Sequence, residues 1–166
     1  MNKTHSRIDS PIGTLLLVVA GGAVAGLYMT GHRPAPGPQL LGTEVPDAMP
    51  AARQQLAEYF NGGRTEFDLP LAARGTGFQE LVWAELRKIP YGQTRSYAWI
   101  AEQIANPGAV RAVGSANARN PISIIVPCHR VVAANGDLTG YAGGIDRKRF
   151  LLQLEGALGG QDRLFG

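Results

Sequence analysis

Residues 96–118 read SYAWIAEQIANPGAVRAVGSANA, which is two helix-forming segments on either side of an Asn-Pro-Gly turn. In the first segment, Ile100 and Ile104 fall on one side of a helix predicted over 96–104. After the tight turn, a second helix is predicted over 109–118. Helix, short glycine-containing turn and helix together form a helix-turn-helix, a motif used by many DNA-binding proteins.

A longer helix is predicted immediately before this motif. Thr76 and Gln79 have the spacing of a capping box, and Pro90 is expected to end the helix. Its buried face should contain the apolar residues at helical spacing, which are Phe78, Leu81, Val82, Leu86 and Ile89.

The first part of the chain alternates short apolar runs with turns. The runs 15–20 and 23–29 flank Gly21 and Gly22, which predicts a β-hairpin. The same apolar residues, following basic ones, also resemble a signal peptide, but Asp9 lies in the basic region and the glycine pair divides the run. We therefore expect a cytoplasmic protein with no membrane segment.

The two parts of the chain are predicted to form two lobes. In the first, the proline-rich stretch 32–50 is expected to be a loop, 51–60 a helix and 67–71 a short strand. The predicted fold class is α+β. It comprises a small N-terminal lobe with an antiparallel sheet, residues 1–73, and a mostly helical C-terminal lobe with the helix-turn-helix and a short wing, residues 74–166.

Positive charge is concentrated in the second lobe. Residues 86–150 carry nine basic side chains against three acidic ones, a net charge of +6, whereas the whole chain is +3, so the remainder is −3. Such a face favours phosphates, because binding releases condensed counterions. A solvated basic surface without a partner is the alternative.

The chain contains one cysteine, Cys128, at the end of an apolar run that is predicted to be a strand. One Cys and three His cannot satisfy the usual zinc patterns, and no intrachain disulfide is possible. A lone cysteine is most often a small buried hydrophobe. The string Pro-Cys-His-Arg-Val, inside a basic lobe with a helix-turn-helix, favours a reactive thiol instead.

The second helix of the motif is rich in small residues. Five small residues would let its backbone approach a partner closely: Ala109, Ala112, Gly114, Ser115 and Ala116. Tight packing against another helix of the same chain explains them equally well.

The stretch Asn-Pro-Ile-Ser-Ile-Ile-Val-Pro-Cys-His-Arg-Val, residues 120–131, resembles the active-site signature of the O6-alkylguanine-DNA alkyltransferases. The resemblance covers nearly the whole chain, in several unrelated blocks that occur in the same order. These blocks are residues 10–13, 78–92, 96–97, 109–114, 138–144 and 148–155.

The resemblance implies a set of catalytic residues. Cys128 would be the nucleophile and final alkyl acceptor, His129 would remove the thiol proton through a bound water, and Glu155 would hold the imidazole in the useful tautomer. Asn120 would brace the turn before the nucleophile. Tyr97 would rotate the target nucleotide, and a tyrosine hydroxyl would stabilise the leaving guanine.

The resemblance also implies the partner, which is double-stranded DNA carrying an alkylated guanine, bound through its minor groove. Arg111 would fill the gap left by the flipped base. The other DNA-binding positions would be Tyr97, Ala109, Gly114, Ser115 and Arg119. The substrate pocket would comprise Tyr97, Val131, Tyr141, Ala142 and Gly143.

The implied reaction is one irreversible transfer per molecule from O6-alkylguanine, and also from O4-alkylthymine, with no cofactor and no metal. The chain lacks the zinc ligands of some relatives and the extra acceptor domain of the bifunctional ones. A monomer is expected, with cooperative binding on DNA left open. Asn117 and Ala142 lie where family members vary, and Trp99 has no functional account.

Three other interpretations compete with this one. A relative that only marks lesions would not need Cys128. A winged-helix regulator would need side chains on the second helix that read base edges, and Ala, Gly and Val dominate there. A cysteine hydrolase would need an oxyanion hole, which no feature of the sequence requires.

Overall fold

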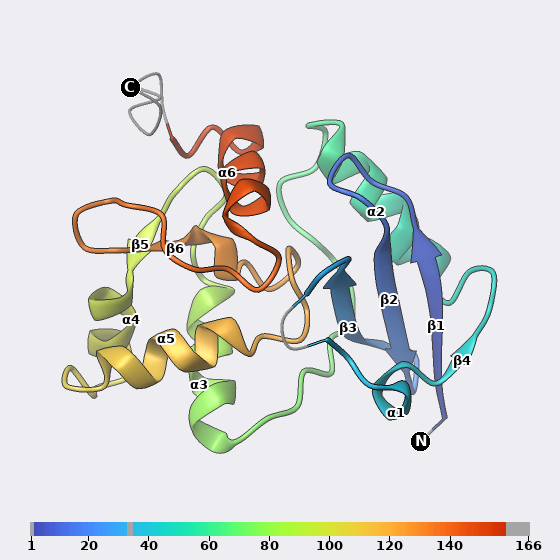
Figure 1. Ribbon diagram of the computed structural model, residues 1–166, viewed down its shortest axis with the longest axis horizontal. Coiled ribbons are helices and arrows are strands. Elements are labelled where there is room, and N and C mark those ends of the chain that lie inside the picture. Colours follow the sequence, from blue (N-terminus) through green and yellow to red (C-terminus); the bar gives the residue numbers. More distant parts are fainter. Residues whose placement is uncertain (1, 33–34, 159–166) are drawn as a thin grey trace. The chain divides into compact units, whose positions relative to one another are not determined.

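The computed structural model describes residues 2–32 and 35–158 (Figure 1). The described chain divides into two compact units. The first unit contains Met1–Arg74 and Pro121–Ser123, and the second contains Gly75–Asn120 and Ile124–Gly166. The predicted C-terminal lobe wrongly included Pro121–Ser123. These residues join the first unit because the Leu27 N–H donates to the Pro121 carbonyl, 2.8 Å away, and Ser123 N–H donates to the Leu27 carbonyl.

The first unit is built on a four-stranded sheet in the order β3-β2-β1-β4. β2 (Leu15–Ala20) pairs antiparallel with both β1 (Lys3–Ile8) and β3 (Ala23–Met29), as predicted. The short β4 (Thr43–Glu44) pairs parallel with β1, so the sheet is not purely antiparallel. The Gly21-Gly22 turn has positive φ at both residues, which is the conformation of a tight hairpin turn.

A single long helix, α2 (Pro50–Phe60), lies beside this sheet (Figure 1). It buries Ala52, Leu56 and Tyr59, which are spaced four and three residues apart and so share one face. Phe60, the last residue of the helix, is half-buried. The unit thus has a small core between one helix and one sheet.

The predicted strand over 67–71 is wrong. In this stretch only Leu71 forms a bridge, to Val24, and the ladder does not extend because Pro70 has no N–H to donate. The predicted loop over 32–50 is also wrong in part, because α1 (Pro38–Leu41) and β4 lie within it. Residues 33 and 34 of that loop lie outside the described residues.

The second unit packs α3 (Gly77–Leu86), α4 (Tyr97–Gln103) and α5 (Val110–Ala118) against one another. α4 and α5 form the predicted helix-turn-helix. α6 (Ile145–Leu154) contacts the turn that carries the cysteine. Two short strands, β5 (Arg95–Ser96) and β6 (Val131–Val132), pair in parallel beside these helices (Figure 1).

The predicted capping box of α3 is present: Thr76 accepts from the Gln79 N–H, and the Gln79 side chain accepts from the Thr76 N–H. The predicted buried face is wrong at Leu81, which is 57% exposed. Trp83 is buried in its place, and its indole N–H donates to the Ala116 carbonyl of α5 at 2.8 Å. The helix also ends at Leu86, before Pro90 is reached.

The predicted strand leading to the cysteine is wrong. Ile122 makes one bridge, the following residues form turns, and Cys128–Arg130 is a 3₁₀ helix. Ile124 takes a φ of 71°, a left-handed conformation that is strained for a β-branched residue. The turn therefore replaces extended backbone, and the cysteine lies on a short helical turn. Among the described residues, no helix is long and apolar enough to cross a membrane.

Candidate active site

Two asparagines, one in the last turn of α5 and one just after the helix, hold the backbone on either side of the cysteine. The Asn120 side chain donates to the Val126 carbonyl at 2.8 Å, and the Asn117 side chain donates to the Cys128 carbonyl at 3.3 Å. Both asparagines are buried, so each replaces a hydrogen bond that water cannot make there. This explains how a turn with strained backbone keeps one conformation.

A buried carboxylate lies against the residue that follows the cysteine. His129 Nε2 is 2.7 Å from Glu155 Oε2, and both side chains are fully buried. Arg130 donates to both Glu155 oxygens, at 2.8 and 3.1 Å, and to the Ile89 carbonyl at 2.6 Å. Because the two oxygens accept three bonds, Glu155 is firmly oriented.

The proton on His129 can be assigned from this geometry. Burial raises the pKa of Glu155, but bonds from His129 and Arg130 outweigh it and lower the pKa to about 2. Burial lowers the pKa of His129, so its imidazole is neutral at neutral pH. An ionised Glu155 accepts, so Nε2 carries the proton and Nδ1 has the free lone pair. Nδ1 has no hydrogen-bond partner among the residues that the structure describes.

The thiol is held in a dry environment. Cys128 is 3% exposed and not in a disulfide. Burial raises the pKa of the Cys128 thiol, whereas hydrogen bonding from Asn120, the charge of Lys148 and hydrogen bonding from Tyr141 lower it. The resting group is therefore a thiol that needs a base to react, with several groups placed to stabilise the thiolate.

The predicted pocket residues lie on β6, on α4 and in the loop before α6. The Tyr97 hydroxyl is 2.6 Å from Thr139 Oγ1, which ties α4 to this loop, and burial raises the pKa of Tyr97. Val131 is completely buried, Gly143 is buried, and Tyr141 and Ala142 are half-buried. Asn120 and Tyr141 act on the thiol by hydrogen bonding, and Tyr97 interacts with it electrostatically.

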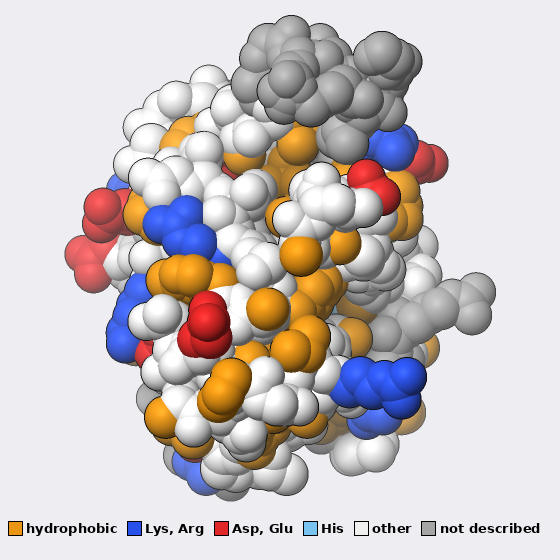
Figure 2. Space-filling view, turned by 90° about the vertical axis from the view of Figure 1, so that its left-hand side faces the viewer, with side chains coloured by type: hydrophobic (Ala, Val, Ile, Leu, Met, Phe, Trp, Pro, Cys, Tyr) orange, Lys and Arg blue, Asp and Glu red, His pale blue; other side chains and the backbone are white. Residues whose placement is uncertain are grey.

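The predicted DNA-binding residues lie along α5 and immediately before it. Arg111, Ser115 and Arg119 are exposed, and Ala109 and Gly114 are half-buried. Figure 2 shows the side of the molecule that carries α4 and α5, where hydrophobic side chains are mixed with separate Lys and Arg side chains. None of these residues contacts the Cys128 turn in the way that Asn117 and Asn120 do.

Gly114 helps to choose between the two explanations of the small residues. A Cβ built at Gly114 would meet only the Tyr97 ring, at 3.9 Å, which is an ordinary van der Waals contact. Packing within the chain therefore does not require glycine here. Close approach by a partner is the other explanation for Gly114. Ala116, in contrast, is buried against α3, where its carbonyl accepts from the Trp83 indole N–H.

Sequence reasoning missed two buried charged residues. Arg130 orients Glu155, and Lys148 lies completely buried on α6. Arg130 belongs to the Pro-Cys-His-Arg-Val string, so its position beside the cysteine was the available signal. No sequence pattern indicated that Lys148 is buried, because it lies between two other basic residues, Arg147 and Arg149, and nothing local distinguishes it from them.

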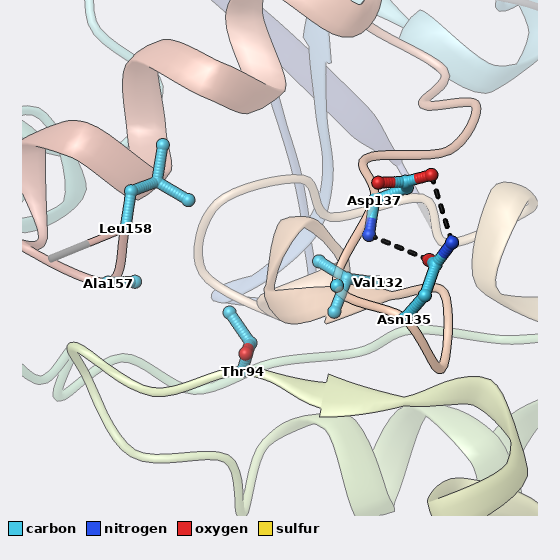
Figure 3. Close-up of a pocket in the computed structure, with 7 residues that line it drawn as sticks. Thr94, Val132, Asn135, Asp137, Ala157 and Leu158 are labelled. Carbon is cyan, nitrogen blue, oxygen red and sulfur yellow. Dashed lines mark hydrogen bonds between the residues drawn. The ribbon is translucent and has the colours of Figure 1, made fainter. Parts of the chain in front are cut away.

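A cavity of about 280 Å³ lies elsewhere in the second unit (Figure 3). Thr94, Val132, Ala157 and Leu158 line it, together with the turn in which Asn135 and Asp137 bond to each other. No predicted site residue lines this cavity. Within residues 2–32 and 35–158, no group of three or more His, Cys, Asp or Glu side chains is arranged to hold a metal ion.

Comparisons with known proteins agree with the architecture. Residues 77–157 match the family model of the 6-O-methylguanine DNA methyltransferase DNA-binding domain. The chain is 55% identical to a methylated-DNA–protein-cysteine methyltransferase of Mycobacterium bovis, with 91% of each chain covered. It is 51% identical to the Methanosarcina acetivorans enzyme of the same name, covering 92% of this chain and 98% of that one.

A solved structure shows the same fold over nearly the full length. The crystal structure of Mycobacterium tuberculosis OGT in complex with DNA superimposes with a TM-score of 0.88 at 51% identity, covering 98% of this chain and 99% of that one. The predicted α+β fold is thereby confirmed. The chain belongs to the methylated-DNA–protein-cysteine methyltransferase family.

Proposed function

We propose that this protein repairs DNA by moving a methyl or larger alkyl group from O6 of guanine to Sγ of its own Cys128. The observation that carries the proposal is the buried His129–Glu155 pair, 2.7 Å apart, beside the cysteine. It provides an oriented, neutral imidazole whose Nδ1 can accept a proton. The relatives named above, and the DNA complex of one of them, support DNA as the partner.

The first step is deprotonation of Cys128 by His129 Nδ1 through a water molecule. The resulting imidazolium is stabilised by the Glu155 carboxylate, which Arg130 holds in place. Asn120 and Tyr141 stabilise the thiolate by hydrogen bonding. This arrangement makes a buried thiol reactive without a metal or a cofactor.

The second step is attack of the thiolate on the saturated carbon bound to O6. A carbon–sulfur bond forms, the carbon–oxygen bond breaks, and its electron pair leaves with guanine. The proton that Cys128 lost is returned to a guanine ring nitrogen, which restores the normal base. Tyr97 donates toward the leaving guanine as negative charge develops. The same bond changes apply to O4-alkylthymine.

Access requires the base to leave the duplex. Cys128 is only 3% exposed, so a base within the helical stack cannot reach it. We assign flipping to Tyr97, which displaces the nucleotide, and to Arg111, which occupies the gap. α5 enters the minor groove with small residues toward the DNA, and Ser115 and Arg119 contact the backbone.

The transfer is irreversible, because a thioether is not cleaved by any group described at the site. Each molecule therefore acts once. To test this, limiting protein is mixed with duplex DNA containing one O6-methylguanine, and the remaining lesion is counted. The expected result is one lesion lost per protein molecule. Many lesions lost per molecule would contradict the single transfer, and binding with no loss would favour a lesion-marking protein.

A further inference from the structure

Lys148 is a buried cation that the mechanism above does not use. It lies in the first turn of α6 with none of its surface exposed, on the face that also buries Leu151 and Leu152. Its Nζ makes one weak hydrogen bond in the described structure, to the Thr139 carbonyl at 3.4 Å. No carboxylate of the described residues forms an ion pair with it. Burying such an ammonium ion costs several kcal/mol, so its position calls for a counter-charge.

The surrounding groups leave one candidate for that counter-charge. Glu155 is already paired with Arg130 and His129. The neighbouring arginines of α6 are bonded elsewhere, Arg147 to the Gly143 carbonyl and Arg149 to Asp146. Two tyrosines, Tyr97 and Tyr141, also face the thiol, and burial raises the pKa of Tyr97, so its hydroxyl is neutral at neutral pH.

We propose that Lys148 is the counter-charge of the Cys128 thiolate and a positioning residue for alkyl transfer. This rests on the function proposed above. Within the part of the chain that the structure describes, its ammonium group has no other partner that can become negative, and α6 contacts the turn that carries Cys128. Through the Thr139 carbonyl, the same ammonium group also holds the loop whose Thr139 hydroxyl bonds to Tyr97.

The electrostatics agree in sign. Burial lowers the pKa of Lys148 to about 8, while Cys128 acts to raise it, so the ammonium form still dominates at neutral pH. The charge of Lys148 lowers the pKa of Cys128 and that of His129. Removing the charge should therefore raise the pKa of the thiol by roughly 1–3 units, the usual effect of one nearby opposite charge.

Two substitutions separate charge from hydrogen bonding. Lys148→Met removes both the charge and the hydrogen bond but keeps a similar volume, so the fold should be retained. Because the substitution removes a buried charge, the melting temperature should not fall. Lys148→Gln keeps a donor for the Thr139 carbonyl but carries no charge. Lys88→Met is the control, because Lys88 is an exposed lysine paired with Glu85.

The test is a pH titration of thiolate absorbance in the DNA-free proteins, with Cys128→Ser as the blank. Because the chain has one cysteine, the signal reports one group. Relative to wild type, we expect the thiol pKa to rise by at least one unit in both Lys148 variants. In Lys88→Met it should stay at the wild-type value. The methyl-transfer rate at neutral pH should fall about tenfold or more and recover at higher pH.

Three results would overturn the proposal: an unchanged thiol pKa in both Lys148 variants, a rise in Lys148→Met alone, or an equal rise in Lys88→Met. The second would reduce Lys148 to a hydrogen-bond donor. Failure of the proposed function gives a different pattern. In that case the thiol pKa would shift as expected, while wild-type protein would remove no methyl group from DNA.

Discussion

Glu155 is the residue on which the site depends most, because it orients the proposed base and balances Arg130. Its carboxylate accepts one bond from His129 and two from Arg130, with no exposed side-chain surface. Losing it would leave a buried guanidinium without a counter-charge. Such a residue contributes to both stability and reactivity, and the two effects can be measured separately.

The stability effect has a defined pH range. The pKa of Glu155 is lowered to about 2 in the folded protein, so the ionised form stabilises the fold above its unfolded pKa of 4.5. That stabilisation, about 3 kcal/mol, should be lost as the pH falls from about 4.5 to about 2. Denaturant unfolding of wild type and Glu155→Gln across this range measures the difference in pH dependence.

At neutral pH, Glu155→Gln should lower the free energy of unfolding by about 3–5 kcal/mol, because Arg130 stays buried without its partner. Glu85→Gln, which breaks a pair with the exposed Lys88, should cost about 0–1 kcal/mol. If the two variants lost equal stability, or if Glu155→Gln kept the acid dependence of wild type, the role given to Glu155 would be wrong.

At the scale of single residues, prediction from the sequence succeeded where the reactive residues are adjacent in a recognisable motif. Cys128 and His129 were found from the Pro-Cys-His-Arg-Val run, and the structure places Glu155 against His129. Arg130 and Lys148 were missed because their importance comes from burial. Burial of Arg130 depends on Glu155, 25 residues further along the chain, and no local pattern reports such a contact.

Among the elements, α5 connects the two halves of the proposed activity. Its exposed surface carries Arg111 and Ser115, while Asn117 near its end donates to the Cys128 carbonyl. The helix that is proposed to meet DNA thus also braces the nucleophile. A change on its exposed face can therefore be separated from a change at the thiol.

Arg111→Ala should slow methyl transfer from duplex DNA about tenfold or more, since filling the gap offsets part of the few kcal/mol that flipping costs. Transfer from a free O6-benzylated guanine base should stay at the wild-type rate, because no gap forms there. Arg7→Ala, on β1 and paired with Glu44, is the control. Equal slowing with both substrates would show that Arg111 acts on the chemistry instead.

Element-scale prediction from sequence worked where local signals agree with one another. The glycine pair of the first hairpin, the capping box of α3 and the turn between α4 and α5 all appear as predicted. Prediction failed where side-chain hydrogen bonds and prolines prevent an apolar run from forming a strand. The apolar run before Cys128 looks like a strand, but Asn120 bonds to the Val126 carbonyl and two prolines interrupt any ladder.

At the scale of the whole molecule, both the charge distribution and the fold place the proposed DNA-binding and catalytic residues in the second unit. Nine of the sixteen basic residues fall between positions 86 and 150, which lie in the second unit apart from Pro121–Ser123. That unit also contains α4, α5 and the Cys128 turn. Residues 1–74 carry six basic and six acidic side chains, so this stretch has no net charge. The first unit also contributes none of the proposed catalytic side chains.

The central claim is that Cys128 itself ends the reaction carrying the alkyl group. The most direct measurement is the intact mass of the protein after incubation with duplex DNA containing one O6-methylguanine, followed by peptide mapping, with Cys128→Ser treated in the same way. We predict a mass gain of one methyl group on the wild type, located on Cys128 and absent from the variant. A wild-type protein that removes the lesion without any gain in mass, or that carries the methyl group on another residue, would contradict the account.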